Sequence, residues 1–220
     1  MADALLLQRV LVIKVSRGQF TIFEDALERP LIGHACCFSN SLGVLQTHMA
    51  SFVSDPQFTA LSGGLNPRCG WITSLPGDQV RLGCLNFGQP VTLRLWNDGC
   101  FACALPVSGR ARLEQYPQGP AGANGPFFLM PKSDQKWQLS ADCELLVLRV
   151  YVEAGMADRM IELLTQSCHD YNGCIECARV MMESIPWRLH HGLEYSAKLQ
   201  ELQRLRNAFL QLFGFPAEPQ

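Results

Sequence analysis

The sequence predicts a mainly β fold with flanking helices, and three features of its pattern carry this prediction. Between about Leu65 and Tyr151, short apolar runs alternate with breaks rich in Gly, Pro, Asn and Asp, which is typical of an all-β sandwich or barrel. After Tyr151 the apolar residues repeat with a helical period instead. Before the β region, a helix is expected from Ser39 or Ser41 to about Val53.

Seven apolar runs are expected to form most of the strands. They are Val80–Phe87, Val91–Trp96, Phe101–Val107, Ala111–Gln115, Phe127–Met130, Lys136–Leu139 and Cys143–Tyr151. The breaks between them contain turn residues, for example at Ser108-Gly109. The last run is apolar at both sets of alternate positions, which predicts a strand buried on both faces. Two further strands are expected near the N-terminus, at 10–15 and 20–23.

The C-terminal part of the chain is expected to be helical. A first helix is predicted over residues 153–167, and the segment 171–186 is ambiguous between helix and strand. A final helix is expected over 189–213, ending at Gly214, because glycine is the common residue just beyond a helix C-terminus. This change of period divides the chain into a β-rich part, residues 1–151, and a helical part, residues 152–220.

Alternation along the strands predicts which side chains point inward. In the run 91–96 and again in the run 101–107, the larger apolar residues fall on one face, and the small residues Ala102 and Ala104 lie opposite them. We expect the larger apolar faces to point into a barrel. The interior is then predicted to contain Leu93, Leu95, Phe101, Cys103 and Leu105.

Arg149 is the charged residue of greatest interest in the predicted strands. It shares a strand face with Leu145 and Val147, where an unpaired charge is costly. The alternative is that Arg149 lies close enough to the strand end to reach solvent. The other arginines on or beside the strands are expected to lie on a solvated face: Arg81, Arg94, Arg110 and Arg112.

The last predicted helix carries an apolar seam. Tyr195, Leu199, Leu202 and Phe209 follow one another at separations typical of a coiled coil. Such a seam must be buried either on the β-rich part of its own chain or on a partner molecule.

Composition restricts the classes of partner. The net charge is -2, and no run of Lys and Arg occurs, so the chain by itself is a poor candidate for nucleic-acid binding. No apolar run approaches the ~20 residues of a membrane span. The sequence has ten cysteines but shows no pattern of a signal peptide at its start. We therefore expect a cytoplasmic protein with reduced thiols and no membrane partner.

The segment 98–115, DGCFACALPVSGRARLEQ, resembles the strand-turn-strand of the effector domain in AraC/XylS-type regulators. The family has a run such as "LPLSG" where this chain has Leu105-Pro106-Val107-Ser108-Gly109. The segment 125–150 is similar to the next part of the pattern, with a strand ending at Pro131 and then "DC-x-LLVLR". The chain thus resembles the N-terminal effector-binding and dimerisation domain of an AraC/XylS-family transcriptional regulator.

The resemblance implies a cupin-like β-barrel that holds a small-molecule effector, followed by helices that form a homodimer. DNA would be contacted only through a helix-turn-helix half that we expect to be missing from this chain. The candidate effector-binding residues are then Leu93, Leu95, Phe101, Cys103, Leu105 and Arg149. The candidate dimerisation residues are Tyr195, Leu199, Leu202 and Phe209. The alternative is a standalone cupin-like small-molecule-binding or interaction protein with no DNA-binding partner domain.

We expect no catalysis, no cofactor and no catalytic metal. Cupin metalloenzymes hold their ions with barrel histidines, but no histidine occurs between Leu65 and Tyr151. No nucleophile elbow, phosphate-binding loop or dinucleotide-binding fingerprint is present either. A zinc site remains open as an alternative, formed by Cys168, His169, Cys174 and Cys177. Without a second CxxC at zinc-ribbon spacing, free cysteines are the preferred interpretation there.

Overall fold

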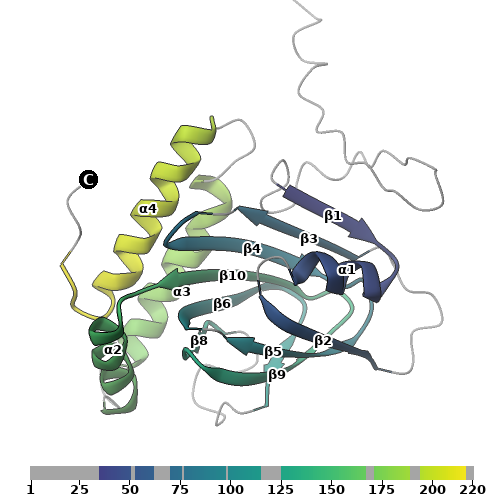
Figure 1. The fold of residues 1–220 in the computed structure, drawn as a ribbon, viewed down its shortest axis with the longest axis horizontal. Helices are drawn as coiled ribbons and strands as arrows, with labels where there is room; N and C mark the ends of the chain where they lie inside the picture. The colour runs from purple at the N-terminus through teal and green to yellow at the C-terminus, as the bar shows by residue number, and fades with distance from the viewer. Residues whose placement is uncertain are drawn as a thin grey trace, which may run out of the picture.

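The computed structural model describes residues 35–50, 53–61, 70–75, 77–97, 99–114, 125–166, 171–188 and 194–216. The strands expected at 10–15 and 20–23 lie outside these residues. Within them the chain forms ten strands and four helices, arranged as two antiparallel sheets with a helical layer (Figure 1). The prediction of a mainly β fold with flanking helices is confirmed.

The two sheets differ in size and in what covers them. The larger sheet contains, in spatial order, β1 (Ala35–Ser39), β3 (Gly70–Leu75), β4 (Val80–Asn86), β10 (Glu144–Tyr151), β6 (Cys100–Ser108) and β8 (Phe127–Leu129). The smaller sheet contains β2 (Ser54–Ala60), β5 (Val91–Asn97), β9 (Ser133–Leu139) and β7 (Ala111–Leu113). Among the described strands no pairing joins the two sheets, so the fold is a double sheet rather than one continuous barrel.

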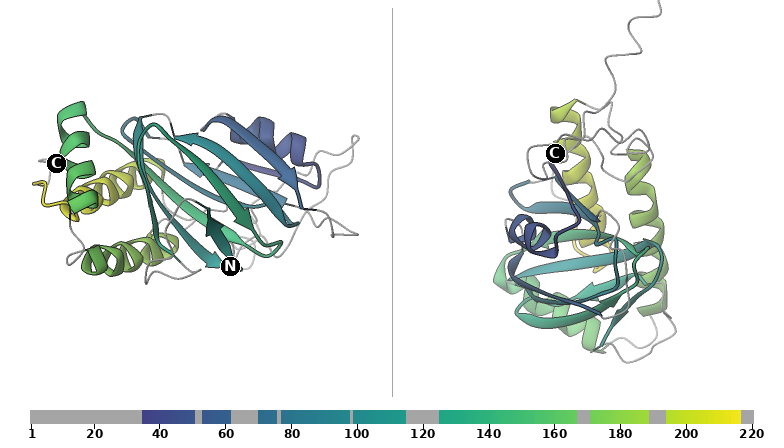
Figure 2. Two further views of the ribbon diagram at one scale, coloured as in Figure 1. Left: turned by 90° about the horizontal axis from the view of Figure 1, so that it is seen from below. Right: turned by 90° about the vertical axis from the view of Figure 1, so that its right-hand side faces the viewer.

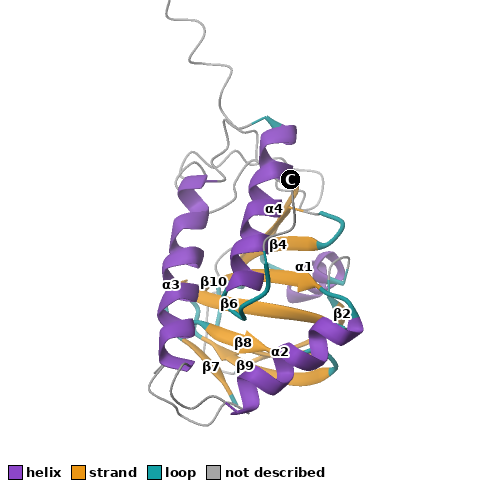
Figure 3. Cartoon of the chain, turned by 90° about the vertical axis from the view of Figure 1, so that its left-hand side faces the viewer, coloured by secondary structure: helices purple, strands orange, loops and turns teal. Residues whose placement is uncertain are grey.

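Three helices form a layer on the outer face of the larger sheet. They are α2 (Ala154–Gln166), α3 (Tyr171–Arg188) and α4 (Tyr195–Gln211), and they lie together on one side of the strands (Figures 2 and 3). The ambiguous segment 171–186 is therefore helical. The short helix α1 (Leu42–Met49) instead packs beside β1 and β2, and it ends four residues before the predicted position, Val53. None of the described helices is long and apolar enough to cross a bilayer.

Two hydrophobic clusters lie on opposite faces of the larger sheet. One fills the space between the sheets and includes Leu93 of β5 and Trp137 of β9. The other joins the outer face of the larger sheet to the helices and includes Met182 of α3. Strand β10 contributes to both clusters, with Leu145 on the inner face and Leu148 on the outer face. The prediction of a strand buried on both faces is confirmed for β10.

The turn between β6 and β7 shows why glycine occupies position 109. Gly109 has a φ of +66°, a conformation that side chains with a Cβ rarely adopt. A Cβ at this position would also lie only 2.5 Å from the backbone nitrogen of Cys143. The Ser108-Gly109 turn predicted from the sequence is therefore fixed both by the local backbone conformation and by the close approach of Cys143, the residue just before β10.

The predicted seam of the last helix is divided between two environments, which corrects the expectation of one dimer seam. Leu202 is 1% exposed and Phe209 is 0% exposed, and both belong to the cluster that α4 shares with the larger sheet. Tyr195 is 62% exposed and Leu199 is 38% exposed. Helix α4 packs on its own sheet through the face that contains Leu205. The spacing of apolar residues in the sequence does not distinguish this buried face from the exposed positions near the helix N-terminus.

Phe209→Ala is expected to lower the free energy of unfolding by about 3–5 kcal/mol, because it leaves a cavity in a fully buried cluster. Its ring packs against Phe128 and Phe213, with centroid separations of 6.3 and 5.3 Å. Tyr195→Ala, on the exposed part of the same helix, should change this free energy by about 0.5 kcal/mol or less. Urea unfolding followed by circular dichroism measures both, and equal losses would contradict this packing of α4.

Candidate functional site

The space between the sheets contains only part of the predicted interior set. Leu93 is fully buried there, and Leu95 packs against the same cluster. The expectation for Phe101, Cys103 and Leu105 is wrong, because all three belong to the cluster on the outer face, beneath the helices. They cannot contact a ligand held between the sheets.

The error has a plain physical reason. The rule that larger apolar side chains point inward assumes that one face of a strand meets solvent, but β6 is covered on both faces. The large residues of β6 fill the gap to the helices, whereas Ala102 and Ala104 face the smaller sheet. The sizes of the side chains along β6 therefore reflect how much space each neighbouring layer leaves. They do not show which face of the strand lies between the two sheets.

Two apolar side chains indicate that the space between the sheets is incompletely filled. Val147 lies in the middle of β10, a central strand, and packs against the inter-sheet cluster, yet it is only partly buried. Its neighbours across the adjoining strands are Gly83 and Ala104, which contribute almost no side-chain volume. Leu95, on the facing sheet, is also only partly buried. Accessible space therefore extends between the sheets to the centre of the larger one.

A polar cluster lies at the end of this space where β5 turns into β6. Arg149 is 4% exposed, and its Nε donates a hydrogen bond to Cys100 Sγ at 3.2 Å. Its Nη2 lies 3.4 Å from Asn97 Oδ1. Asn97 in turn donates from Nδ2 to the carbonyl oxygens of Cys100, at 2.7 Å, and Met130, at 2.6 Å. The guanidinium is thus held in a fixed position by groups from β5, β6 and β10.

Burial by itself lowers the pKa of the Arg149 guanidinium, since it disfavours the charged form. Electrostatic interactions and hydrogen bonds with Cys100 and Tyr151 outweigh this effect and hold the pKa above its ordinary value. Arg149 therefore remains charged at the end of the inter-sheet space. The alternative expectation, that this side chain reaches solvent at the strand end, is wrong.

Tyr151 and Arg81 extend the polar cluster. The Arg81 guanidinium carbon lies 5.3 Å from the centroid of the Tyr151 ring, and that of Arg149 lies 5.8 Å from it. Both distances are in the range of cation–π attraction. Arg81 was expected on a solvated face, but it is half-buried, and its neighbours Val80 and Leu82 point the other way, into the helix-side cluster. Arg81 therefore shares the inner face with Arg149.

The facing sheet contributes two further polar side chains. Gln135 of β9 is buried and donates from Nε2 to Ser133 Oγ at 3.1 Å. Trp137, two residues further on the same strand face, is 1% exposed, and no described residue accepts a hydrogen bond from its Nε1. A buried indole N–H without an acceptor is unfavourable by about 1–3 kcal/mol. The inner faces of both sheets thus present hydrogen-bond donors.

The remaining predicted arginines lie on surfaces, as expected. Arg94, on the outer face of the smaller sheet, donates from Nε to both carboxylate oxygens of Asp134 at 3.0 Å. This ion pair holds the pKa of Asp134 below its ordinary value. Arg110 and Arg112 are exposed. None of these three side chains takes part in the inter-sheet site.

The thiols give little support for a metal centre. Of the alternative zinc set, Cys168 and His169 lie outside the described residues, Cys174 is half-buried near the Leu212 carbonyl oxygen and Cys177 is exposed. Within the described part of the chain, no three His, Cys, Asp or Glu side chains are grouped in a way that would hold a metal ion. Burial raises the pKa of Cys143 to about 12, with the charges of Asp142 and Glu144 adding to the effect.

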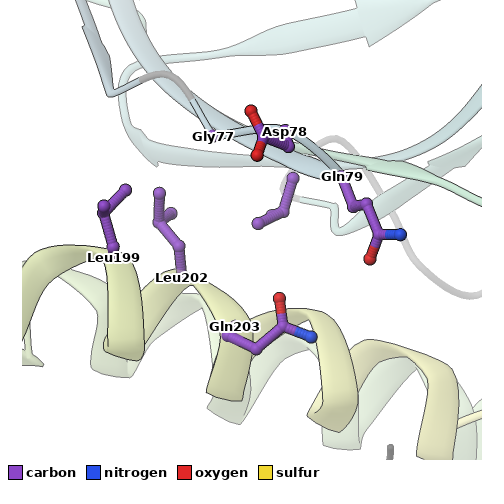
Figure 4. A pocket seen from close by; sticks show the side chains of 7 residues that line it. Gly77, Asp78, Gln79, Leu199, Leu202 and Gln203 are labelled. Atoms are coloured by element: carbon purple, nitrogen blue, oxygen red, sulfur yellow. The ribbon is translucent and has the colours of Figure 1, made fainter.

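A second hollow lies between α4 and the connection from β3 to β4, with a volume of about 310 Å³ (Figure 4). Leu199, Leu202 and Gln203 line it from the helix, opposite Asp78 and Gln79 (Figure 4). The exposed residue Leu199 therefore sits at the rim of a groove on the surface of α4.

Of the predicted binding residues, Leu93, Leu95 and Arg149 face the inter-sheet space, but sequence reasoning missed many other residues that do. The missed residues are Arg81, Asn97, Cys100, Gln135, Trp137, Val147 and Tyr151. Arg81, Val147 and Tyr151 carried a usable signal, because alternation from Arg149 and from Leu85 places them on the inner face. The other residues can be assigned to the inter-sheet space only when it is known how the two sheets pack face to face.

The fold is similar to that of known proteins. The crystal structure of the AraC-like transcriptional activator CuxR superposes with a TM-score of 0.52 at 11% sequence identity, over 83% of this chain and 69% of that chain. KdgF from Halomonas sp. gives a TM-score of 0.31 at 12% identity, over 43% of this chain and 88% of that one. A cupin 2 conserved barrel domain protein from Rhodopseudomonas palustris gives a TM-score of 0.28 at 13% identity, over 51% of this chain and 86% of that one.

No protein-family model and no curated protein sequence matches the chain. At 11% identity, the similarity to the CuxR structure establishes a shared fold over 83% of this chain. The chain is therefore a double-sheet module with a C-terminal helical layer.

If space adjoins Val147, a larger side chain should fit there. Val147→Phe is expected to change the free energy of unfolding by less than about 1 kcal/mol, whereas Val150→Phe should lower it by about 1–3 kcal/mol through overpacking. Val150 is the matched control, because it is fully buried on the opposite face of the same strand. Chemical denaturation measures both variants. A large loss in Val147→Phe would show that the sheets are tightly packed at this point.

Proposed function

We propose that this chain is the small-molecule-sensing module of an AraC-type transcriptional regulator, and that the effector binds between the two sheets. One observation carries the proposal. The accessible space beside Val147 and Leu95 ends at a cluster of fixed hydrogen-bond donors that includes Arg149. An apolar cavity with a few placed polar groups is the usual form of a small-molecule site.

The similarity to an AraC-like activator supports the regulatory part of this proposal. In the proposed mechanism, effector binding favours one arrangement of β10 and of the helices packed on it, which changes the placement of an attached DNA-binding unit. The module acts by binding and does not catalyse a reaction. We place it in the cytoplasm, where its thiols remain reduced.

A homodimer formed through α4 is part of the proposal. Because Leu202 and Phe209 are already buried within the chain, the contact is assigned to the exposed pair Tyr195 and Leu199, beside the groove opposite Asp78. A two-fold contact would bring each pair against the same surface of the second copy.

The effector site is tested with a small-molecule library screened by thermal shift. Ligands that bind the native state raise its apparent stability, so at least one compound should raise the melting temperature of the wild-type protein. Val147→Phe should abolish this shift while remaining folded. Val180→Phe, on the exposed surface of α3, is the matched control and should retain it. A shift that persists in Val147→Phe, or a library without any such compound, contradicts an inter-sheet site.

The dimer contact is tested separately by Leu199→Arg. This substitution should weaken self-association without unfolding the chain, because Leu199 is partly exposed in the single chain. Leu202→Arg is the contrasting variant and should unfold the helical layer, since it places a charge in a buried cluster. Light scattering measures self-association, and circular dichroism measures whether each variant is folded. A wild-type protein that is monomeric at tens of micromolar, or a Leu199→Arg variant that associates normally, contradicts the assigned contact.

A further inference from the structure

One buried donor between the sheets has no acceptor among the described residues. The donor is the indole Nε1 of Trp137, on β9, whose side chain is almost completely buried. Buried N–H groups in native proteins nearly always have an acceptor, so each exception needs a physical explanation. Trp137 belongs to the cluster that fills the space between the sheets, where the proposed effector binds. An acceptor that arrives with the ligand would satisfy this donor.

The side chains around the indole are apolar. Its direct neighbours on the adjoining strands are Leu93 of β5 and Leu113 of β7, and both are buried. The Phe127 ring of β8 packs against the indole at an interplanar angle of 85°, with the ring centroids 5.2 Å apart. A ring face accepts a hydrogen bond only weakly. These side chains therefore supply no oxygen or nitrogen atom to accept the indole hydrogen.

The indole lies next to the accessible part of the inter-sheet space. Leu95, which is only partly buried, pairs with Gln135, and Trp137 is the next side chain on that face of β9. The Gln135 amide nitrogen donates to Ser133, so it is directed toward the opposite end of the strand. Two residues of strand span about 7 Å. A ligand body beside Leu95 can therefore extend an acceptor to Trp137.

The Arg149 guanidinium lies at the other end of this space. It contacts Asn97, which pairs with Ser133, four residues before Trp137 on β9. Four residues of strand span about 13 Å. A carboxylate beside the indole would lose its hydration among leucine and phenylalanine side chains, which is costly for a charged group. A neutral acceptor, such as a carbonyl oxygen, avoids most of this cost.

We infer that Trp137 determines the specificity of the inter-sheet site by donating a hydrogen bond from Nε1 to a neutral carbonyl oxygen of the ligand. This inference rests on the proposed function and assigns the chemical class of the effector, an uncharged and largely apolar carbonyl compound. The indole N–H can only donate, so the complementary group is an acceptor. The apolar part of the ligand contacts Leu95 and Val147. Because the N–H is already desolvated in the ligand-free chain, the new hydrogen bond favours binding strongly.

Nuclear magnetic resonance of the ¹⁵N-labelled chain tests the hydrogen bond directly. The four tryptophans give four indole N–H signals, and replacing each tryptophan in turn by phenylalanine assigns the signal of Trp137. Acetophenone should move this signal downfield, as the formation of a hydrogen bond does. Ethylbenzene, which has the same ring without an acceptor, should not move it downfield. Benzoate has nearly the shape of acetophenone but is charged, and it should also leave the signal in place.

Thermal shift at several probe concentrations measures the contribution of Trp137 to affinity. The affinity for acetophenone relative to that for ethylbenzene should fall at least about fivefold in Trp137→Phe, because the hydrogen bond is lost. Trp71→Phe is the matched control, since it shortens an equally buried tryptophan in the helix-side cluster. It should leave this ratio unchanged. Circular dichroism verifies that both variants are folded.

The assignment is overturned if acetophenone does not stabilise the protein, or if the Trp137 signal stays in place when it is added. It is also overturned if the affinity ratio is unchanged in Trp137→Phe, if it falls equally in Trp71→Phe, or if benzoate stabilises as well as acetophenone. The proposed sensing function is judged separately. Library compounds that lose their effect in Val147→Phe but keep it in Trp137→Phe support the inter-sheet site and contradict only the role of Trp137.

Discussion

The larger sheet is buried on both faces, by the smaller sheet on one side and by α2, α3 and α4 on the other, and this constraint shapes every other feature of the molecule. Its strands must be apolar at consecutive positions, as β10 is. The bulky side chains of β6 are used on the helix side, which leaves alanines toward the smaller sheet. Space between the sheets therefore follows from the placement of small residues on the inner face of β6.

The same constraint connects the inter-sheet site to the helical layer. Along β10, Leu146, Leu148 and Val150 contact the helix-side cluster, while Val147 and Arg149 face the inter-sheet space. A shift of this strand on ligand binding cannot be absorbed on one face alone, because close-packed interiors transmit displacement. In the proposed regulator, β10 would be the element whose position both the effector and the helices bias.

The polar groups of the inter-sheet space lie near the ends of strands. The turn from β5 to β6 positions Asn97 and Cys100 beside Arg149, so that a buried charge on β10 is hydrogen-bonded to groups from two other strands. A buried charge is tolerated only with such partners. The cluster is consequently rigid on the Arg149 side, and its adaptable member is Arg81.

Local pattern in the sequence was sufficient for the strands from β4 to β10, for the turn at Gly109 and for α2, because period and turn chemistry are properties of neighbouring residues. The strands β1 to β3 lacked a clear alternation and were not foreseen. Tertiary structure decided which face of β6 is inner, since alternation separates two faces but cannot say what covers each. It also divided the α4 seam, burying Phe209 while leaving Tyr195 exposed. The opposition of Arg81 and Arg149, 68 positions apart in the sequence, depends on strand register, which only the folded sheets define.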